Sequence, residues 1–349
     1  MRLSDYTTLR LGGPARRFVH AGTEEDLIEA VRAADSGGEP TLILGGGSNL
    51  VVADEGFDGT VIQVATKGVD PGGEPGLMTV AAGEDWDAVV AWTVAAGLAG
   101  LECLSGIPGL AGATPIQNVG AYGQEVAETI TSVRTYDRVT GQIRTIPNER
   151  CGFGYRTSMF KRDDARRHVV LGVTFRLAVQ SASAPVRYAE LASALGVEIG
   201  DQAASPRVRS AVMDLRRGKG MVIDAADPDT RSAGSFFVNP VLDGAGLAAV
   251  EAAARARCGP ETQVPRFAAT EEGLVKVPAA WLIERAGFGR GYSLGDGARI
   301  SSKHTLALVN YESATTAGLI ALARRIRDGV RGTFGVSLTS EPVLVGVTL

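Results

Sequence analysis

The sequence predicts a mixed α and β protein of two or three domains, built from short strands, amphipathic helices and long glycine-rich loops. Its 349 residues are enough for two or three domains of ordinary size. Hydrophobic residues make up 45% of the chain and charged residues 21%, which is typical of a soluble globular protein. In some segments apolar residues recur at every second position, as in strands, and in others at every third or fourth position, as in helices. Several long stretches show neither spacing.

The N-terminal half contains most of the predicted strands. Thr23 can cap a helix whose first turn is acidic and whose residues Leu27, Val31 and Ala34 share one face. Thr140 and Gly141 form the turn of a predicted hairpin over residues 132–146. Further strands are expected at 41–44, 60–64, 77–82 and 168–179, and a further helix at 86–96.

The C-terminal half is richer in predicted helices. Ser205 followed by Pro206 predicts a helix start in which the serine is the cap. The same apolar spacing predicts helices at 246–257, 278–286 and 314–328. Strands are expected at 306–310, 336–338 and 343–349.

Charge, cysteine and histidine patterns exclude several classes of protein. The net charge of −4, without a long run of one sign, argues against a surface for nucleic acid or an anionic membrane. The longest nearly apolar stretch, 88–101, is too short to span a bilayer, and the N-terminus lacks a signal-type apolar run. The three cysteines and three histidines are scattered without metal-ligand spacing. We therefore expect free thiols, no metal site and a cytoplasmic location.

The glycine-rich stretch within residues 41–52 (TLILGGGSNLVV) is the main candidate for a ligand loop. Three successive glycines allow backbone N–H groups to approach a ligand closely, and phosphate is a frequent one. Gly47 precedes Ser48 and Asn49, so the lysine of a P-loop is missing. Leu50 stands where a Rossmann fingerprint needs its third glycine. A hairpin or a mobile loop remains an alternative.

Three polar residues in irregular surroundings are candidates for chemistry. Ser235 is flanked by glycine and aromatic residues, although an ordinary serine at a strand end gives the same pattern. Arg156 follows a Gly-Tyr pair in a turn, where its guanidinium could hold a carboxylate or could simply be exposed. Glu341 lies between apolar segments, as a carboxylate at the rim of a fold also would.

Several motifs in order along the chain carry a resemblance to a known family. They are residues 44–49 (LGGGSN), 107–118 (IPGLAGATPIQN) with 121–123 (AYG), 154–161 (GYRTSMFK), 233–240 (AGSFFVNP), Lys276 to Glu284, Ser302 to Asn310, and Glu341-Pro342. In this order the chain resembles the UDP-N-acetylenolpyruvoylglucosamine reductases, flavoenzymes of bacterial peptidoglycan precursor synthesis. The resemblance covers essentially the whole chain.

The resemblance implies an α+β fold with a two-subdomain FAD-binding module of the vanillyl-alcohol-oxidase (PCMH) type, followed by an α+β substrate-binding domain. On this basis residues 1–66 would be the first FAD-binding subdomain, with the C-terminal strands of 336–349 returning to it. Residues 67–200 would be the second subdomain, and 201–335 the substrate-binding domain. In such a fold, backbone amides of irregular loops hold the cofactor pyrophosphate, which suits a glycine loop that is not of the Rossmann type.

The resemblance also implies cofactors, a substrate and roles for single residues. FAD would be bound and NADPH would be the hydride donor. The substrate would be UDP-N-acetylglucosamine enolpyruvate, which takes a hydride from flavin N5 at C3 and a proton from Ser235 at C2 to give UDP-N-acetylmuramate. Arg156 and its partner Glu341 match the residues that meet the developing negative charge. FAD contacts match Gly45, Gly46, Gly47, Ser48, Asn49, Pro108, Gly109, Gly112, Thr114, Gln117, Asn118 and Tyr122.

Substrate contacts are implied for Tyr188, Asn239 and Lys276, the first of which matches a tyrosine that closes over the diphosphate in one subgroup. Two basic positions of relatives are replaced here, by Val238 and by Ile223 about twelve positions before the serine. Arg231 or the group Arg216, Arg217 and Lys219 could supply the missing charge. The expected partner is a small molecule, with no nucleic acid, no membrane and a monomeric chain.

Two other functions remain open at this point. Another flavoprotein oxidase or dehydrogenase of the same fold would bind FAD but would not need Ser235, Arg156 and Glu341 together. A non-catalytic nucleotide-sugar binding protein would not need the two cofactor loops.

Overall fold

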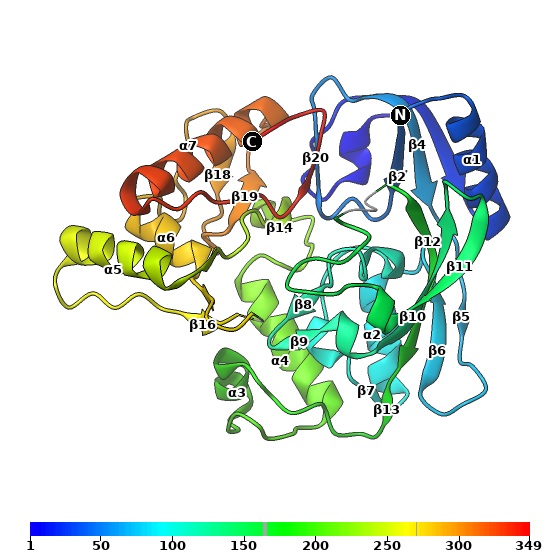
Figure 1. Cartoon of the computed structure of the whole chain (residues 1–349), viewed down its shortest axis with the longest axis horizontal. Coiled ribbons are helices and arrows are strands. Elements are labelled where there is room, and N and C mark those ends of the chain that lie inside the picture. The colour runs from blue at the N-terminus through cyan, green and yellow to red at the C-terminus, as the bar shows by residue number, and fades with distance from the viewer. Residues whose placement is uncertain (163–165, 270) are drawn as a thin grey trace. The chain divides into compact units, whose positions relative to one another are not determined.

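The computed structural model describes residues 1–162, 166–269 and 271–349, and it divides into two compact units (Figure 1). Unit 1 comprises Met1, 15–46 and 58–222, and unit 2 comprises 2–14, 47–57 and 223–349. Residues 201–222 fall in unit 1, where helix α4 (Ser205–Gly218) contacts α2 (Trp86–Ala95) and α3 (Ala189–Leu195). The three-part division expected from the sequence stays a prediction, since one compact unit can hold two subdomains.

The first sheet of unit 1 has the strand order β1-β4-β2 and packs against helix α1 (Glu24–Ser36). Its strands are β1 (Ala15–Ala21), β2 (Thr41–Leu44) and β4 (Phe57–Val64), and β2 runs parallel to β4. Thr23 and Asp26 form a capping box at the start of α1. Leu27, Val31 and Ala34 are buried, which confirms the predicted helix and its apolar face.

The second sheet of unit 1 is antiparallel, in the order β11-β10-β12-β6-β5. Trp86 of α2 packs on Phe175 of β12, with 5.9 Å between their ring centroids, in the largest apolar core of this unit. The predicted hairpin is confirmed by β10 and β11. The strands of this sheet are β5 (Val69–Asp70), β6 (Leu77–Ala81), β10 (Ile130–Asp137), β11 (Gln142–Pro147) and β12 (His168–Arg176).

Short elements complete unit 1. The pairs β7–β13 and β8–β9 are antiparallel, and α3 and α4 share a small apolar cluster. The short elements are β7 (Leu98–Ala99), β8 (Gly120–Ala121), β9 (Gln124–Glu125), β13 (Ala178–Val179), and the 3₁₀ turns η2 (Glu102–Leu104), η3 (Ala111–Ala113), η4 (Val126–Glu128) and η5 (Asn148–Arg150).

The predicted capping role of Ser205 is wrong. Helix α4 starts at Ser205 itself, its cap position is Ala204, and no side chain caps it. The Ser205 hydroxyl is buried and makes no hydrogen bond within the described residues. Because Pro206 is tolerated anywhere in the first turn, the Ser-Pro pair fixed the start of the helix only to within one residue.

Unit 2 is a layer of helices over short antiparallel sheets, in the orders β14-β19-β18 and β15-β17-β16. Helix α7 (Thr316–Phe334) extends beyond the predicted end at 328, and its buried face includes Leu319, Leu322 and Ile326. The other elements are η1 (Leu3–Tyr6), β3 (Leu50–Val52), η6 (Pro228–Thr230), β14 (Ser232–Ser235), β15 (Val241–Leu242), α5 (Gly244–Cys258), β16 (Phe267–Ala268), β17 (Val275–Lys276), α6 (Ala279–Arg285), β18 (Ala298–Ile300), β19 (Ala307–Asn310) and β20 (Val343–Val345).

The C-terminal segment differs in part from expectation. Strand β20 lies parallel to β3, with Val343 opposite Leu50. The strand predicted at 336–338 is wrong: this segment is irregular, although Val336 and Leu338 are buried in the core of unit 2. The alternation of apolar residues in this segment therefore reflects burial of every second side chain, and not hydrogen bonding to a neighbouring strand. In the described part of the chain, no helix combines the length and the apolar composition that crossing a membrane requires.

Candidate active site

In unit 1 the first glycine loop touches the second. A Cβ atom added at Gly46 would lie 2.8 Å from the Cα of Gly109, and one at Gly45 would lie 3.9 Å from the Leu110 side chain. Gly112 packs equally tightly, since its Cβ would come 2.4 Å from that of Ala82 at the end of β6. The two loops, far apart in sequence, thus form one backbone surface from which side chains are excluded.

The rest of the first loop belongs to unit 2. Gly47 has φ +61°, and a Cβ there would lie 1.8 Å from the carbonyl oxygen of Tyr6, so its backbone conformation and its surroundings both require glycine. The Asn49 side chain donates to the carbonyl of Glu341 at 3.5 Å, and the Asn49 carbonyl accepts from Val343 N–H at 2.9 Å. The loop therefore leads directly to one of the predicted catalytic residues.

Ser235 and Glu341 lie close together in unit 2. The Glu341 N–H donates to the carbonyl of Phe236 at 2.9 Å, and Phe237 forms a bridge with Ser340. Both phenylalanines are almost fully buried, with ring centroids 5.1 Å apart. They anchor the backbone directly after Ser235, which itself is partly exposed. The structure thus brings together two predicted catalytic residues that are far apart in sequence.

A bulge presents Ser235. In the pairing of β14 with β19, Ser232 lies opposite Val309 and Ser235 opposite Ala307, with an irregularity between them. Gly234 has φ +72° within this irregularity, and its N–H donates to the Ser232 hydroxyl at 3.2 Å. A bulge redirects a side chain relative to the regular ladder, and such bulges are frequent next to active sites.

Arg156 stands in a turn that is fastened to the second glycine loop in unit 1. The buried Ser158 hydroxyl donates to the Ile116 carbonyl at 2.6 Å. Arg156 has φ +53°, an uncommon value for a residue with a side chain. Its guanidinium donates to the Gly120 carbonyl at 2.7 Å and lies 5.3 Å from the Tyr155 ring centroid. The side chain is therefore held in a fixed direction.

Among the predicted cofactor residues of the second loop, two have largely internal roles. The Asn118 side chain donates to Glu125 at 2.7 Å and to the Gly154 carbonyl at 3.1 Å, and accepts from Ala127 N–H. The Thr114 hydroxyl donates to the Ala111 carbonyl at 2.7 Å, within the same loop. Both side chains are buried, so they fix the conformation of the loop, and a ligand would meet the backbone of the loop.

Tyr122 and Tyr188 meet edge to face in unit 1, with ring centroids 5.6 Å apart. The Lys219 ammonium lies 5.5 Å from the Tyr122 ring centroid and 2.5 Å from a Glu190 carboxylate oxygen. Burial raises the pKa of Tyr122 to about 12, so its hydroxyl stays protonated at neutral pH. Ile223, the residue noted as replacing a basic group, has 57% of its surface exposed. Lys219, which is one of the residues expected from the sequence to supply the missing charge, lies beside Tyr122.

Asn239 and Lys276 lie on two adjacent segments of unit 2. The Asn239 side chain accepts from the N–H of Ala279 at 2.9 Å, at the start of α6. Lys276 on β17 pairs with Val241 on β15, and Val277 N–H donates to the Pro240 carbonyl at 3.0 Å. The segment after Ser235 and the segment around Lys276 are therefore held side by side.

Comparison with known proteins identifies the family. A model of the FAD binding domain matches residues 15–146, and one of the UDP-N-acetylenolpyruvoylglucosamine reductase C-terminal domain matches 227–345. The UDP-N-acetylenolpyruvoylglucosamine reductase of Saccharopolyspora erythraea is 58% identical over 99% of this chain and 95% of its own. That of Thermobifida fusca is 53% identical, over 99% and 97%. The chain belongs to the UDP-N-acetylenolpyruvoylglucosamine reductase family.

A solved structure of this reductase family has the same fold. The UDP-N-acetylenolpyruvylglucosamine reductase of Thermus caldophilus is 26% identical, with a TM-score of 0.65 over 99% of this chain and 97% of that one. The fold expected from the sequence is confirmed: an FAD-binding module of the PCMH type together with the C-terminal domain of the reductase family.

As a member of this reductase family, the chain is an oxidoreductase with FAD as its cofactor. The residues present fit that cofactor. Gly46 and Gly109 leave backbone without side chains where the loops meet, and neither 45–49 nor 107–118 contains a carboxylate that would repel a pyrophosphate. The assignment of FAD to the single residues of these loops remains a prediction.

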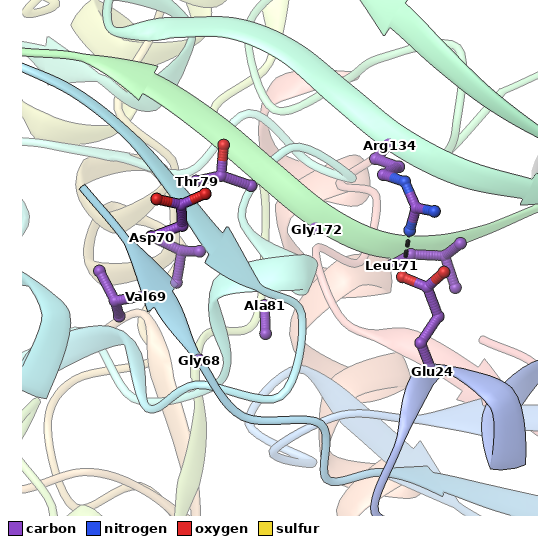
Figure 2. A pocket seen from close by; sticks show the side chains of 10 residues that line it. Glu24, Gly68, Val69, Asp70, Thr79, Ala81, Arg134, Leu171 and Gly172 are labelled. Carbon is purple, nitrogen blue, oxygen red and sulfur yellow. Dashed lines mark hydrogen bonds and ion pairs between the residues drawn. The ribbon is translucent and has the colours of Figure 1, made fainter. Parts of the chain in front are cut away.

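A pocket of about 330 Å³ in unit 1 lies apart from these residues (Figure 2). It is lined by the start of α1 and by strands β5, β6, β10 and β12, and the Arg134 guanidinium and Glu24 carboxylate form an ion pair across it. None of the predicted catalytic, cofactor or substrate residues lines it. In the described residues, no group of three or more His, Cys, Asp or Glu is arranged to hold a metal ion.

Proposed function

We propose that the protein reduces UDP-N-acetylglucosamine enolpyruvate to UDP-N-acetylmuramate, with NADPH as the reductant. The observation that carries this proposal is the hydrogen bond from Glu341 N–H to the Phe236 carbonyl, which ties Glu341 to the residue next to Ser235. A flavoprotein of another specificity would not require this pair. The identity of the full-length relatives supports the same substrate.

The reaction adds a hydride to C3 and a proton to C2 of the enolpyruvyl group. The loops at 45–49 and 107–118 would hold FAD, which would supply the hydride-transfer chemistry between NADPH and C3 of the substrate. Negative charge then develops on the carboxylate side of the substrate, where fixed donors stabilise it. We assign this role to Arg156, whose guanidinium is fixed by the Gly120 carbonyl, and we assign Glu341 as its partner in catalysis.

Ser235 is the proposed proton donor to C2. A serine hydroxyl is a weak acid, so it can donate only to a strongly basic carbon and only where water is excluded. The buried Phe236 and Phe237 make the neighbourhood of Ser235 apolar, and the bulge at Gly234 fixes its direction. Proton transfer from Ser235 to C2 completes the reduction of the substrate, and the serine alkoxide that is left takes a proton from solvent after product release.

Tyr188 and Lys219 are the proposed diphosphate contacts, and Asn239 and Lys276 are proposed to bind other parts of the sugar nucleotide. Tyr188 is 39% exposed and packs on Tyr122, so its hydroxyl can reach a ligand. Lys219 is close to the Tyr122 ring and is held by Glu190. Lys219 can leave the Glu190 carboxylate and bind a phosphate instead, so its positive charge has a negative partner both before and after the ligand binds.

We also propose that the chain acts as a monomer in the cytoplasm and has neither nucleic acid nor membrane as a partner. The free state of Cys103, Cys151 and Cys258 suits a reducing compartment. The net charge of −4 argues against a basic surface for polyanions. Light scattering of the purified protein at working concentration tests the monomer, and a dimer mass would refute it.

Anaerobic stopped-flow measurement of flavin absorbance tests the function. NADPH should bleach the flavin, and UDP-N-acetylglucosamine enolpyruvate should then restore its colour. Ser235→Ala should leave bleaching unchanged and slow restoration by 10²- to 10⁴-fold, as expected for loss of a general acid. Ser36→Ala, at the exposed end of α1, is the control. Equal loss in both half-reactions would refute the role of Ser235, and no restoration by the sugar nucleotide would favour another flavoprotein function.

A further inference from the structure

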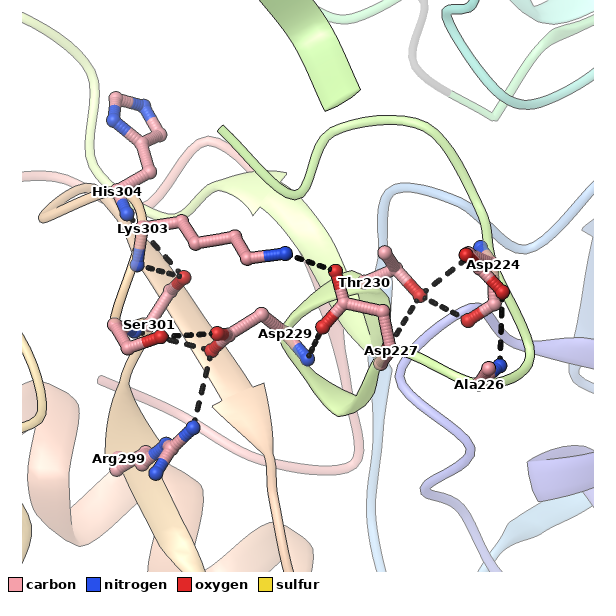
Figure 3. A network of polar contacts seen from close by, with 10 residues as sticks. Asp224, Ala226, Asp227, Asp229, Thr230, Arg299, Ser301, Lys303 and His304 are labelled. Carbon is pink, nitrogen blue, oxygen red and sulfur yellow. Dashed lines mark hydrogen bonds and ion pairs between the residues drawn. The ribbon is translucent and has the colours of Figure 1, made fainter. Parts of the chain in front are cut away.

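A buried carboxylate lies on the segment that leads into the Ser235 strand. Asp229, in the 3₁₀ turn η6, has 4% of its surface exposed. It accepts hydrogen bonds from the Ser302 N–H at 3.1 Å and from the Ser302 hydroxyl at 2.5 Å, and it faces the Arg299 guanidinium at 3.4 Å (Figure 3). The Asp229 carboxylate thus joins two segments of unit 2 that are far apart in sequence.

A second carboxylate reinforces this connection. Asp227 accepts from the Lys303 ammonium at 2.6 Å and from the N–H of Asp229 at 3.0 Å (Figure 3). Burial by itself would raise the pKa of Asp229, but the bonds from Ser302 and the charge of Arg299 hold that pKa below its usual value. Asp229 is therefore ionised at neutral pH, and its bonds to Ser302 are charge-assisted.

Arg299 depends on this carboxylate. Its guanidinium lies 3.3 Å from the centroid of the Tyr311 ring, and its Nε is buried without a hydrogen bond in the described part of the chain. A guanidinium in such a position is costly to leave without a counter-charge. Loss of the Asp229 charge should therefore displace the Arg299 side chain and, with it, the turn that follows β18.

Both connected segments run to Ser235. Six residues after Asp229 the chain reaches Ser235 at the end of β14, and the turn that begins at Ser302 leads to Leu306 and Ala307. Ala307 lies opposite Ser235, and the Leu306 carbonyl accepts from the Phe236 N–H at 2.7 Å. The pairing of β14 with β19 is irregular just before Ser235. The contacts of the segments before and after this irregularity therefore fix the position of Ser235 more than the strand pairing does.

We propose that Asp229, through Ser302 and Arg299, is a positioning residue that holds Ser235 in place for proton transfer. The proposal rests on the proposed role of Ser235 as proton donor. Asp229 is not itself a catalytic residue, because its carboxylate is occupied by Ser302 and Arg299. A displacement of about 1 Å at a reacting group can slow a step on the order of 10²-fold.

Asp229→Asn tests the proposal, because asparagine keeps the size of the side chain but loses its charge and turns an N–H₂ group toward N–H donors. We expect flavin content and bleaching by NADPH to stay within twofold of the unmodified protein. Restoration of flavin absorbance by the sugar nucleotide should slow on the order of 10²-fold. Asp224→Asn is the matched control, since the Asp224 carboxylate accepts from Ala226 N–H in the same loop. It should leave both half-reactions unchanged.

A double substitution separates positioning from general damage. If Asp229 acts through Ser235, then Asp229→Asn should change the restoration rate less than twofold in a Ser235→Ala background. An equal loss in both backgrounds would overturn the proposal, and so would a normal restoration rate in Asp229→Asn alone. If Ser235→Ala alone restores colour normally, the proposed proton donor is wrong, and that result is distinct from a failure of Asp229.

Ser302→Ala covers the case in which Asp229→Asn does not fold. This change removes the hydroxyl bond to Asp229 but keeps the bond from the Ser302 backbone. We expect a slowing of restoration on the order of tenfold, with bleaching by NADPH unchanged. A restoration rate equal to that of the unmodified protein would overturn the proposal.

Discussion

Gly46 and Gly109 approach each other so closely that a side chain at position 46 would meet backbone: its Cβ would lie 2.8 Å from the Gly109 Cα. The two residues come from the two loops that hold FAD according to the family resemblance. Backbone, unlike the end of a flexible side chain, can give way only if a whole loop moves. This contact therefore links the shape of one loop to the shape of the other.

Replacement of Gly46 by alanine should weaken cofactor binding. Forcing a methyl group into a packed position costs about 1–3 kcal/mol, which corresponds to a loss of FAD affinity of roughly 5- to 150-fold. Fluorescence titration of the apoprotein with FAD measures this change. Gly73→Ala is the control, because no atom lies within 4 Å of its Cβ position and its φ is ordinary. Unchanged FAD affinity in Gly46→Ala would contradict the placement of the cofactor at these loops.

Lys219→Ala should raise the KM for the sugar nucleotide and leave kcat within about twofold. A hydrogen bond to a charged group contributes about 1.5–3 kcal/mol, so a rise of KM of about 10- to 100-fold is expected. Steady-state kinetics with NADPH at saturation measure it. Arg217→Ala is the matched control, since Arg217 lies two residues away and pairs with the exposed Asp214. A KM equal in the two variants would show that Lys219 does not bind the diphosphate.

The sequence predicted those elements that depend only on residues close together in the chain. Helix α1 was predicted because a cap at Thr23 and an apolar face coincide within thirteen residues. The hairpin of β10 and β11 was predicted from alternation around the turn at Thr140 and Gly141. Both signals act between residues that are neighbours in the chain. The glycine loop at 45–49 also has a local signal, and its backbone does approach other backbone closely at Gly46 and Gly47. Its contact with a ligand stays a prediction.

Long-range features could not be predicted in this way. The pairing of Asp229 with Ser302 depends on a sheet that brings β14 beside β19, and neither residue has a distinctive local pattern. The bulge at Gly234 likewise arises only when β14 meets its partner. The catalytic candidates themselves came from the family resemblance, because Ser235 and Glu341 each have ordinary sequence surroundings.

The stability of unit 1 should depend on pH through the buried carboxylate of Asp137, which pairs with the half-buried Arg167. Its side chain is fully buried and accepts from the Arg167 guanidinium at 2.8 and 3.1 Å, and from Val139 and Thr140 N–H groups. The hydrogen bonds from Arg167 are the main cause that holds the pKa of Asp137 well below its usual range. A lowered pKa in the folded state means that the stability this carboxylate contributes is complete above the unfolded pKa of about 4. This contribution to stability is lost as the pH falls from about 4 toward the pKa of Asp137 in the folded protein.

Asp137→Asn should therefore destabilise the protein most at neutral pH. Loss of charge-assisted bonds should lower the free energy of unfolding by about 1.5–3 kcal/mol at pH 7, and this difference should shrink below about pH 4. Urea unfolding of the two proteins at pH 7, 5, 4 and 3 measures it. Asp58→Asn is the control, because the Asp58 side chain is 90% exposed and its loss should change stability little at any pH. A difference for Asp137→Asn that stayed constant from pH 7 to 3 would mean that its charge does not stabilise the fold.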